Sequence, residues 1–286
     1  MLLQFVINGL ITGLLYSLLA IGFALVYNTT HIFHIAAAGI YVFAAYMFWW
    51  LGGVVGVIAA GGMVLIIVAF LSLFIDLSTY RPLQRRKSSL NSLLVVSIGI
   101  TTILVNLLAM FFGNDSKLLL SDTETIEIGS IFITNVQIFQ FLICVLVLTL
   151  FLLFIKKTSL GLRLLALNSD SKLFVILGYN ENRTRSFVFL LSGVFIGLSS
   201  ILNVYDVGLD PNMGMNILIN AMVAMIIGGI GRLDMCIVGG VLLGILQSLV
   251  IYQFSSTWQM AITFLVLIVL LFLRPQGILG FKQRTI

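Results

Sequence analysis

The first 75 residues of the chain contain no Asp, Glu, Lys or Arg. A charged side chain at the centre of a bilayer costs about 2.5–3.5 kcal/mol, whereas each Leu or Ile contributes only about 0.3–0.6 kcal/mol toward insertion. One charge therefore cancels the contribution of about six apolar residues. A charge-free run of this length is suited to lipid, and at about 20 residues per crossing it is long enough for about three membrane spans.

The rest of the chain has the same character. Of its 286 residues, 60% are hydrophobic and 9% are charged, whereas a soluble domain carries about 25% charged residues. Apolar runs of about 17–25 residues are typical of transmembrane helices, while barrel strands alternate apolar and polar residues in segments of about ten. The sequence therefore predicts an all-α integral membrane protein with a single transmembrane domain over residues 1–286. The net charge of +5 is attributed to membrane orientation and not to nucleic-acid binding.

The hydropathy pattern predicts about nine transmembrane segments, within a range of eight to ten. The short, glycine-ended segment 216–230 and the stretch 28–39 are expected to be broken or re-entrant, because interrupted helices often line a transport pathway. The nine spans are expected near residues 4–27, 32–50, 54–75, 90–112, 137–155, 186–204, 216–230, 236–252 and 258–273.

Basic residues separate by side when the chain crosses nine times. The connections on one side then hold 14 of the 15 Lys and Arg residues, and only Lys117 lies on the other side, in the acidic segment 114–136. By the positive-inside rule the C-terminus is cytoplasmic and the N-terminus faces outside. The external loop 114–136 and the cytoplasmic segment 156–185 are too short to bury a core. We therefore expect no ATPase or enzyme domain within this chain.

Four pairs of glycines at i, i+4 spacing predict close helix packing, because glycine lets membrane helices approach one another. These are Gly9/Gly13, Gly52/Gly56, Gly193/Gly197 and Gly240/Gly244.

The predicted spans hold no ionisable carboxylate, Lys or Arg at mid-depth, which argues against a self-powered secondary transporter and a membrane-embedded enzyme. His31 and His34 would share a helix face at i, i+3 spacing, but two ligands are a weak metal signal, so we expect no metal site. Neutral polar side chains in the spans either bond neighbouring helices or line a hydrophilic path. The candidate pathway residues are Asn8, Tyr16, Asn28, His34, Asn106 and Asn220.

The segment 156–185 predicts a short amphipathic helix outside the membrane. Residues 168–170 supply an N-cap, 173–177 an apolar turn and Gly178 a stop. Its exposed apolar residues need a cover, either the lipid surface or a partner protein.

This segment and several other motifs together resemble the permease subunits of branched-chain amino-acid ABC importers. The resemblance covers essentially the whole chain, and it is specific because the motifs share their order and spacing. The motifs are Asn8-Gly9, Tyr16 to Gly22, Tyr80-Arg81-Pro82-Leu83, Gly161-Leu162-Arg163, Leu177-Gly178-Tyr179-Asn180, Ile227 to Gly231 with Gly239-Gly240, and Arg274 to Gly280.

The resemblance implies a division of labour in a bacterial inner membrane. A binding protein outside the cytoplasm captures the solute, this chain and a second similar permease form the passage, and two cytoplasmic subunits bind ATP, so the chain needs no cofactor of its own. The resemblance assigns coupling to these ATPases to Gly161, Arg163, Asp170, Lys172, Leu177 and Gly178.

The substrate stays open among several solutes. The family commonly carries Asn-Phe-Ala-His-Gly-Glu where this chain has His34-Ile35-Ala36-Ala37-Ala38-Gly39. Leucine, isoleucine and valine are the expected substrates, with urea or short-chain amides on the same scaffold as an alternative. An ATP-independent channel for a small polar solute is the alternative from another class.

Overall fold

The computed structural model describes residues 2–118, 125–128, 131–169, 171–273 and 277. The expected C-terminal motif from Arg274 to Gly280 therefore lies outside the described residues, except for Gly277. The contacts of the chain divide it into two compact units. Unit 1 holds Met1–Ala24, Leu120–Leu150 and Ile219–Ile286, and unit 2 holds Leu25–Leu119 and Phe151–Leu218.

Apolar helices account for most of the described chain. Seven are long and apolar enough to cross a membrane, and two more apolar helices are shorter, with 16 residues each. This confirms the expected class, a helical membrane protein. The nine are α1 (Leu2–Thr30), α2 (Ala36–Val55), α3 (Val57–Ile75), α5 (Leu90–Phe112), α6 (Asn135–Lys157), α9 (Glu181–Val207), α10 (Met213–Gly228), α11 (Met235–Gln253) and α12 (Trp258–Leu273).

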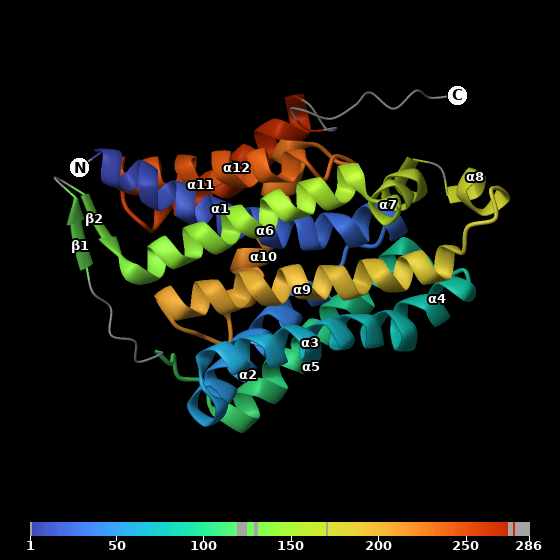
Figure 1. Ribbon diagram of the computed structural model, residues 1–286, viewed down its shortest axis with the longest axis horizontal. Coiled ribbons are helices and arrows are strands. Elements are labelled where there is room, and N and C mark those ends of the chain that lie inside the picture. The colour runs from blue at the N-terminus through green and yellow to red at the C-terminus, as the bar shows by residue number, and fades with distance from the viewer. Residues whose placement is uncertain (1, 119–124, 129–130, 170, 274–276, 278–286) are drawn as a thin grey trace. The chain divides into compact units, whose positions relative to one another are not determined.

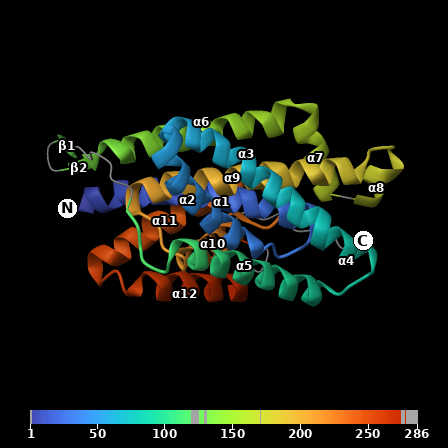
Figure 2. The same cartoon turned by 90° about the horizontal axis from the view of Figure 1, so that it is seen from below.

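In unit 1, glycines on α1 and α11 bring the two helices into backbone contact. A β-carbon at Gly9 would lie 2.8 Å from the Gly244 carbonyl oxygen, and one at Gly13 would lie 2.8 Å from the Gly240 carbonyl oxygen. Ser17 reinforces the contact, since its hydroxyl donates to the Ile237 carbonyl at 3.0 Å. Helices α11 and α12 follow one another and lie side by side (Figure 2).

A β-hairpin in unit 1 lies within the segment 114–136, where the sequence predicted a loop and no strand. Strands β1 (Thr125–Ile128) and β2 (Ile131–Thr134) pair antiparallel, with Thr125 opposite Thr134. Both strands are rich in β-branched residues, which favour a pleated backbone. The Gln4 side chain donates to the Phe132 carbonyl at 2.7 Å and accepts from its amide at 2.8 Å, which fastens β2 to the start of α1.

Unit 2 is built around α2, α3 and α9, which pack on one another, and α5 packs on α2 (Figure 1). A β-carbon at Gly193 would lie 2.8 Å from the Val68 carbonyl oxygen, so α9 approaches the backbone of α3 closely at this point. Gly197, one turn further on, would meet the side chains of Leu65 and Val68 at 3.3–3.4 Å. By contrast, a β-carbon at Gly52 would meet nothing within 4 Å.

The connections of unit 2 differ from three expectations. Gly56 does not pack a helix but separates α2 from α3 with a φ of +86°. Residues 31–34 are not helical, because His31 has a φ of +55° and ends α1, so the two histidines do not share a helix face. The stretch 28–39 consequently holds the end of α1, a short connection and the start of α2, so the helix is broken here.

Helix α3 also continues beyond the expected end of its span. A π-helical turn, η1 (Asp76–Tyr80), joins it directly to α4 (Arg81–Arg85). The basic stretch expected to be a connection is thus helical up to Arg85. π-helical turns are rare and occur frequently at functional sites.

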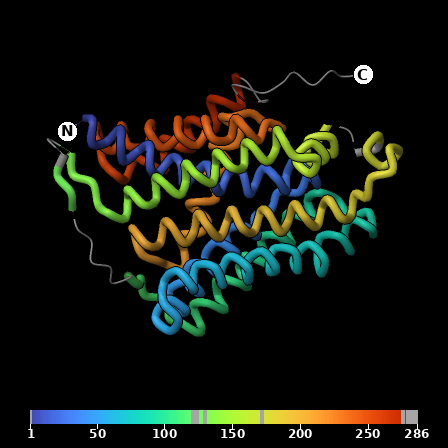
Figure 3. Tube along the Cα trace, in the orientation of Figure 1, coloured from blue at the N-terminus to red at the C-terminus, as the bar shows by residue number. Residues whose placement is uncertain are grey.

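The segment 156–185 holds two helices where one was expected (Figure 3). They are α7 (Ser159–Ser169) and α8 (Ser171–Ile176). Asn168 and Ser169 belong to α7, and Asp170 lies outside the described residues, so no N-cap at 168–170 is described. The stop is present: Gly178 has a φ of +83°, which glycine adopts without strain.

Candidate functional site

Unit 1 contains a buried cluster of neutral polar side chains from four helices. The Gln247 amide of α11 donates to the Asn220 side chain of α10 at 3.0 Å and to the Thr263 hydroxyl of α12 at 2.6 Å. The Gln259 amide donates to the Gln247 side-chain oxygen at 3.0 Å. The Tyr16 hydroxyl of α1 bonds with the side chains of Asn220 and Gln259. We call these five residues the amide cluster.

The amide cluster provides several donors and acceptors without a net charge. Such groups can exchange partners with a small polar solute, and they can equally hold the four helices together. Two of the predicted pathway residues, Tyr16 and Asn220, meet here. Sequence reasoning missed Gln259 and Thr263, although their i, i+4 spacing in an otherwise apolar helix places them on one face.

A second buried polar group lies in unit 2 around His34. Its Nδ1 lies 3.0 Å from the Tyr80 hydroxyl, which in turn lies 2.8 Å from the Ser97 hydroxyl. Ser97 also accepts a hydrogen bond from the Ala36 amide at 2.8 Å, so it joins α5 to the start of α2. Burial lowers the pKa of His34 to about 3, which keeps the imidazole neutral. Tyr80 and Ser97 act here as positioning residues for the ring.

The other three predicted pathway residues stand apart from these two groups. Asn8 accepts a hydrogen bond from Gln4 at 3.2 Å in unit 1. Asn28 is buried in unit 2, and its amide nitrogen has no partner within the described residues. Asn106 is exposed and donates to the Thr102 carbonyl of its own helix at 2.8 Å.

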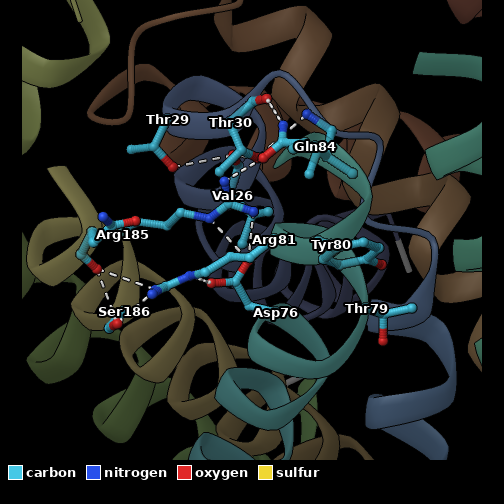
Figure 4. A network of polar contacts seen from close by, with 12 residues as sticks. Val26, Thr29, Thr30, Asp76, Thr79, Tyr80, Arg81, Gln84, Arg185 and Ser186 are labelled. Atoms are coloured by element: carbon cyan, nitrogen blue, oxygen red, sulfur yellow. Dashed lines mark hydrogen bonds and ion pairs between the residues drawn. The ribbon is translucent and has the colours of Figure 1, made fainter. Parts of the chain in front are cut away.

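An ion cluster ties the end of α3 to the start of α9 in unit 2 (Figure 4). The Asp76 carboxylate is fully buried, with 0% exposure, and both of its oxygens are used. One accepts from Arg81 Nε at 2.6 Å, and the other accepts from Arg185 Nε and Nη2 at 2.9 and 2.5 Å. Asp76 lies one residue beyond the charge-free run and the expected span 54–75, so nothing in the sequence indicated that it is buried.

Polar neighbours complete the ion cluster. Arg81 also donates to the Ser186 hydroxyl at 2.6 Å and to the Asn182 carbonyl at 3.1 Å. Arg185 also bonds with the Gln84 side chain. Figure 4 shows these side chains converging from α4 and α9 on the single carboxylate. The first two turns of α9 are thereby fixed to η1 and α4.

The predicted coupling residues lie in α7, α8 and the turn after them. Gly161 packs against the backbone of Phe154 and Ile155, so a side chain at this position would clash. The Arg163 guanidinium lies 5.1 Å from the centre of the Tyr179 ring.

Tyr179 in turn stacks on Phe174 at 5.1 Å between ring centres. Leu177 is exposed. Asp170 is outside the described residues, as is the side chain of Lys172. Within the part of the chain that is described, α7, α8 and the start of α9 lie at the same end of unit 2 as α4 (Figure 3).

The described residues contain no group of three or more His, Cys, Asp or Glu side chains that could hold a metal ion. The structure thus defines a helical membrane protein with neutral polar groups between its helices and charged contacts at helix ends.

Comparison with known proteins identifies the family. The chain belongs to the family described as the permease component of the branched-chain amino acid transport system, which matches residues 5–271. The resemblance noted in the sequence is therefore confirmed.

Individual relatives match along nearly their full length. The chain is 28% identical to the high-affinity branched-chain amino acid transport system permease protein BraD of Pseudomonas aeruginosa, over 97% of this chain and 95% of the relative. It is 26% identical to the permease protein LivH of Escherichia coli K12, with the same two coverages. It is also 25% identical to a probable LivH of Methanocaldococcus jannaschii, over 96% and 91% of the two chains.

A solved structure has a similar fold. This is PsaBC from Streptococcus pneumoniae in complex with Fab, which is 14% identical and has a TM-score of 0.53. The likeness covers 94% of this chain and 91% of that chain. At this identity it supports the fold alone.

Proposed function

We propose that this chain is the membrane-spanning permease subunit of an ATP-driven importer of branched-chain amino acids. The observation that carries the proposal is the family match over residues 5–271, together with relatives that align over more than nine-tenths of their own length. Those relatives are named as branched-chain amino acid transport permeases. The segments between its apolar helices are short, and in this proposal its energy is supplied by partner subunits.

In this proposal the chain crosses a bacterial inner membrane nine times, with its N-terminus outside. All nine apolar helices count as spans, including the shorter α10 and α12. The supporting observation is the charge distribution, because nine crossings place 14 of the 15 Lys and Arg residues on the cytoplasmic side. The β1–β2 hairpin then faces outside, where a solute-binding protein docks.

In this proposal the neutral polar groups contact the solute, and the charged groups transmit movement from the ATP-binding subunits. The amide cluster and the His34 group present hydrogen-bonding side chains between otherwise apolar helices. An amino acid bound as a zwitterion has no net charge, so it can pass such groups without a fixed counter-ion. A second permease subunit completes the passage beside this one.

In this proposal α7 and α8 couple ATP hydrolysis in the partner subunits to movement of α9. Two cytoplasmic ATP-binding subunits would press on the exposed apolar residues of α8 and on Leu177. Because Asp76 holds Arg185 near the start of α9, a displacement there is carried into α3 and α4. Only a difference in contact between the two states of the ATPases can shift the permease equilibrium.

Uptake by the assembled importer tests this proposal. The chain is co-expressed with candidate ATPase, permease and binding-protein subunits, and the assembly is reconstituted in sealed vesicles. Labelled leucine is offered with a hundredfold excess of unlabelled valine, urea or acetamide. Competition by valine alone supports the proposal, competition by urea or acetamide assigns the alternative substrate, and purification without any ATPase favours a channel.

A further inference from the structure

A cavity of about 360 Å³ lies at the end of α3 and along α4 in unit 2. Its lining is formed by Leu77, Arg81, Pro82, Arg85 and Arg86. Three arginines and two apolar residues thus line one small, open pocket. We call it the α4 pocket.

The charges of the α4 pocket are only partly neutralised within the chain. Arg81 is committed to Asp76 and Ser186. Arg85 and Arg86 are exposed, and neither guanidinium makes an ion pair within the described residues. Both oxygens of Asp76 already accept hydrogen bonds from Arg81 and Arg185, so this carboxylate does not neutralise Arg85 or Arg86. The pocket therefore fits an anion.

An apolar stripe on the outer surface of α3 leads directly to this pocket. Ile66, Phe70, Phe74 and Leu77 follow one another at intervals of four, four and three residues, and their side chains are between 48% and 65% exposed. This spacing places them on one helical face. Leu77 belongs both to the stripe and to the pocket, so the apolar surface and the arginines are continuous.

We propose that the α4 pocket binds the phosphate headgroup of an anionic phospholipid whose acyl chains lie along the stripe. The inference rests on the membrane placement proposed above, which puts the pocket at the cytoplasmic surface of the bilayer. Guanidinium groups bind phosphate oxygens in bidentate fashion, and basic residues next to a span attract anionic lipids. A free anion would use the arginines but not the stripe, whereas a phospholipid uses both.

Lipid binding by the full chain tests the proposal. The purified chain is exchanged into mixtures of phosphatidylglycerol and phosphatidylcholine, and the bound lipid is counted by native mass spectrometry. The variant is Arg85→Gln with Arg86→Gln. The matched control is Lys156→Gln with Lys157→Gln, which removes two positive charges from the exposed last turn of α6. Gel filtration and thermal unfolding are used to check that each variant is folded.

The expected result is a preference for phosphatidylglycerol that weakens about 25-fold in the arginine variant, from roughly fivefold per basic residue. The lysine control should weaken it less, because Lys156 and Lys157 do not line the pocket. Equal weakening in both variants, or none in the arginine variant, overturns the proposal. Displacement of the lipid by millimolar inorganic phosphate would assign the pocket to a free anion and would also overturn it.

Loss of ATPase co-purification with unchanged lipid binding would assign the pocket to a partner protein and would likewise overturn the proposal. The lipid measurement needs neither solute nor nucleotide. Its failure therefore leaves the transport proposal standing, and a failure of transport leaves the lipid result intact.

Discussion

The ion cluster around Asp76 makes a strong prediction about stability. Replacing Asp76 with Ala leaves Arg81 and Arg185 without their carboxylate, at sites where the two side chains are only 12% and 11% exposed. Removing one partner of a buried ion pair destabilises a protein by about 3–5 kcal/mol. Arg81 keeps Ser186 and Arg185 keeps Gln84 as partners, so we expect the lower end of this range, about 3 kcal/mol. Asp76→Asn retains one acceptor, and we expect about 2 kcal/mol.

Unfolding of the purified chain in mixed detergent micelles, titrated with dodecyl sulfate and followed by circular dichroism, measures these values. Asp234→Asn is the matched control, because Asp234 pairs with Arg232 at 3.2 Å and both side chains are about one-quarter to one-third exposed. Such an exposed pair contributes less than about 1 kcal/mol. Adding Arg185→Gln to Asp76→Asn should restore part of the lost stability, since it removes one unpaired charge. If Asp76→Asn costs no more than Asp234→Asn, the cluster does not stabilise the fold and the reasoning is refuted.

Three further predictions follow from other parts of the structure. Gly240→Val forces a β-carbon into the Ser17 backbone of α1 and should destabilise the chain by about 1–3 kcal/mol in the same assay. Gly52→Val, whose β-carbon meets nothing within 4 Å, should cost less than about 0.5 kcal/mol. Equal costs for the two variants would contradict the packing argument. Burial lowers the pKa of His34 to about 3, below the unfolded value of about 6.5, so the unfolded state takes up the proton first as the pH drops. The free energy of unfolding should therefore fall by about 1.4 kcal/mol per pH unit from about pH 6.5 toward pH 3. When unfolding is measured between about pH 7.5 and 5, His34→Asn should lose this pH dependence and His31→Asn should keep it. Gly178→Trp places a large side chain at a φ of +83° after α8, and it should separate ATP hydrolysis from uptake while the protein still inserts; unchanged uptake per ATP hydrolysed would count against the coupling role.

Hydropathy predicts the apolar helices of this chain well because it depends only on the residues within each segment and not on contacts with distant ones. Each expected span from residue 4 to residue 273 overlaps a helix of the structure, with ends that shift by a few residues. The end of α3 shows why boundaries are harder. Asp76 reads as the start of a solvated connection, but Arg185 of α9, 109 positions away, pairs with it together with Arg81, and the helix continues.

The candidate sites were predictable only in part, because they depend on contacts between distant segments. Tyr16 and Asn220 could be chosen as polar residues within apolar runs. Their association with Gln247 and Thr263 could not be derived, since it requires the packing of α1, α10, α11 and α12. The hairpin of β1 and β2 was missed for a different reason. Strand pairing within a short loop is too weak a signal beside long apolar helices.

The central claim is that this chain is a permease driven by ATP-hydrolysing partners. The most direct measurement is the accumulation of labelled leucine in sealed vesicles. One set of vesicles holds the full assembly and the other holds the purified chain alone. Each set is measured with and without ATP on the side of the membrane that carries the ATPases. We predict accumulation above the external concentration only for the full assembly with ATP. Uphill accumulation by the chain alone, or by the assembly without nucleotide, would contradict the account.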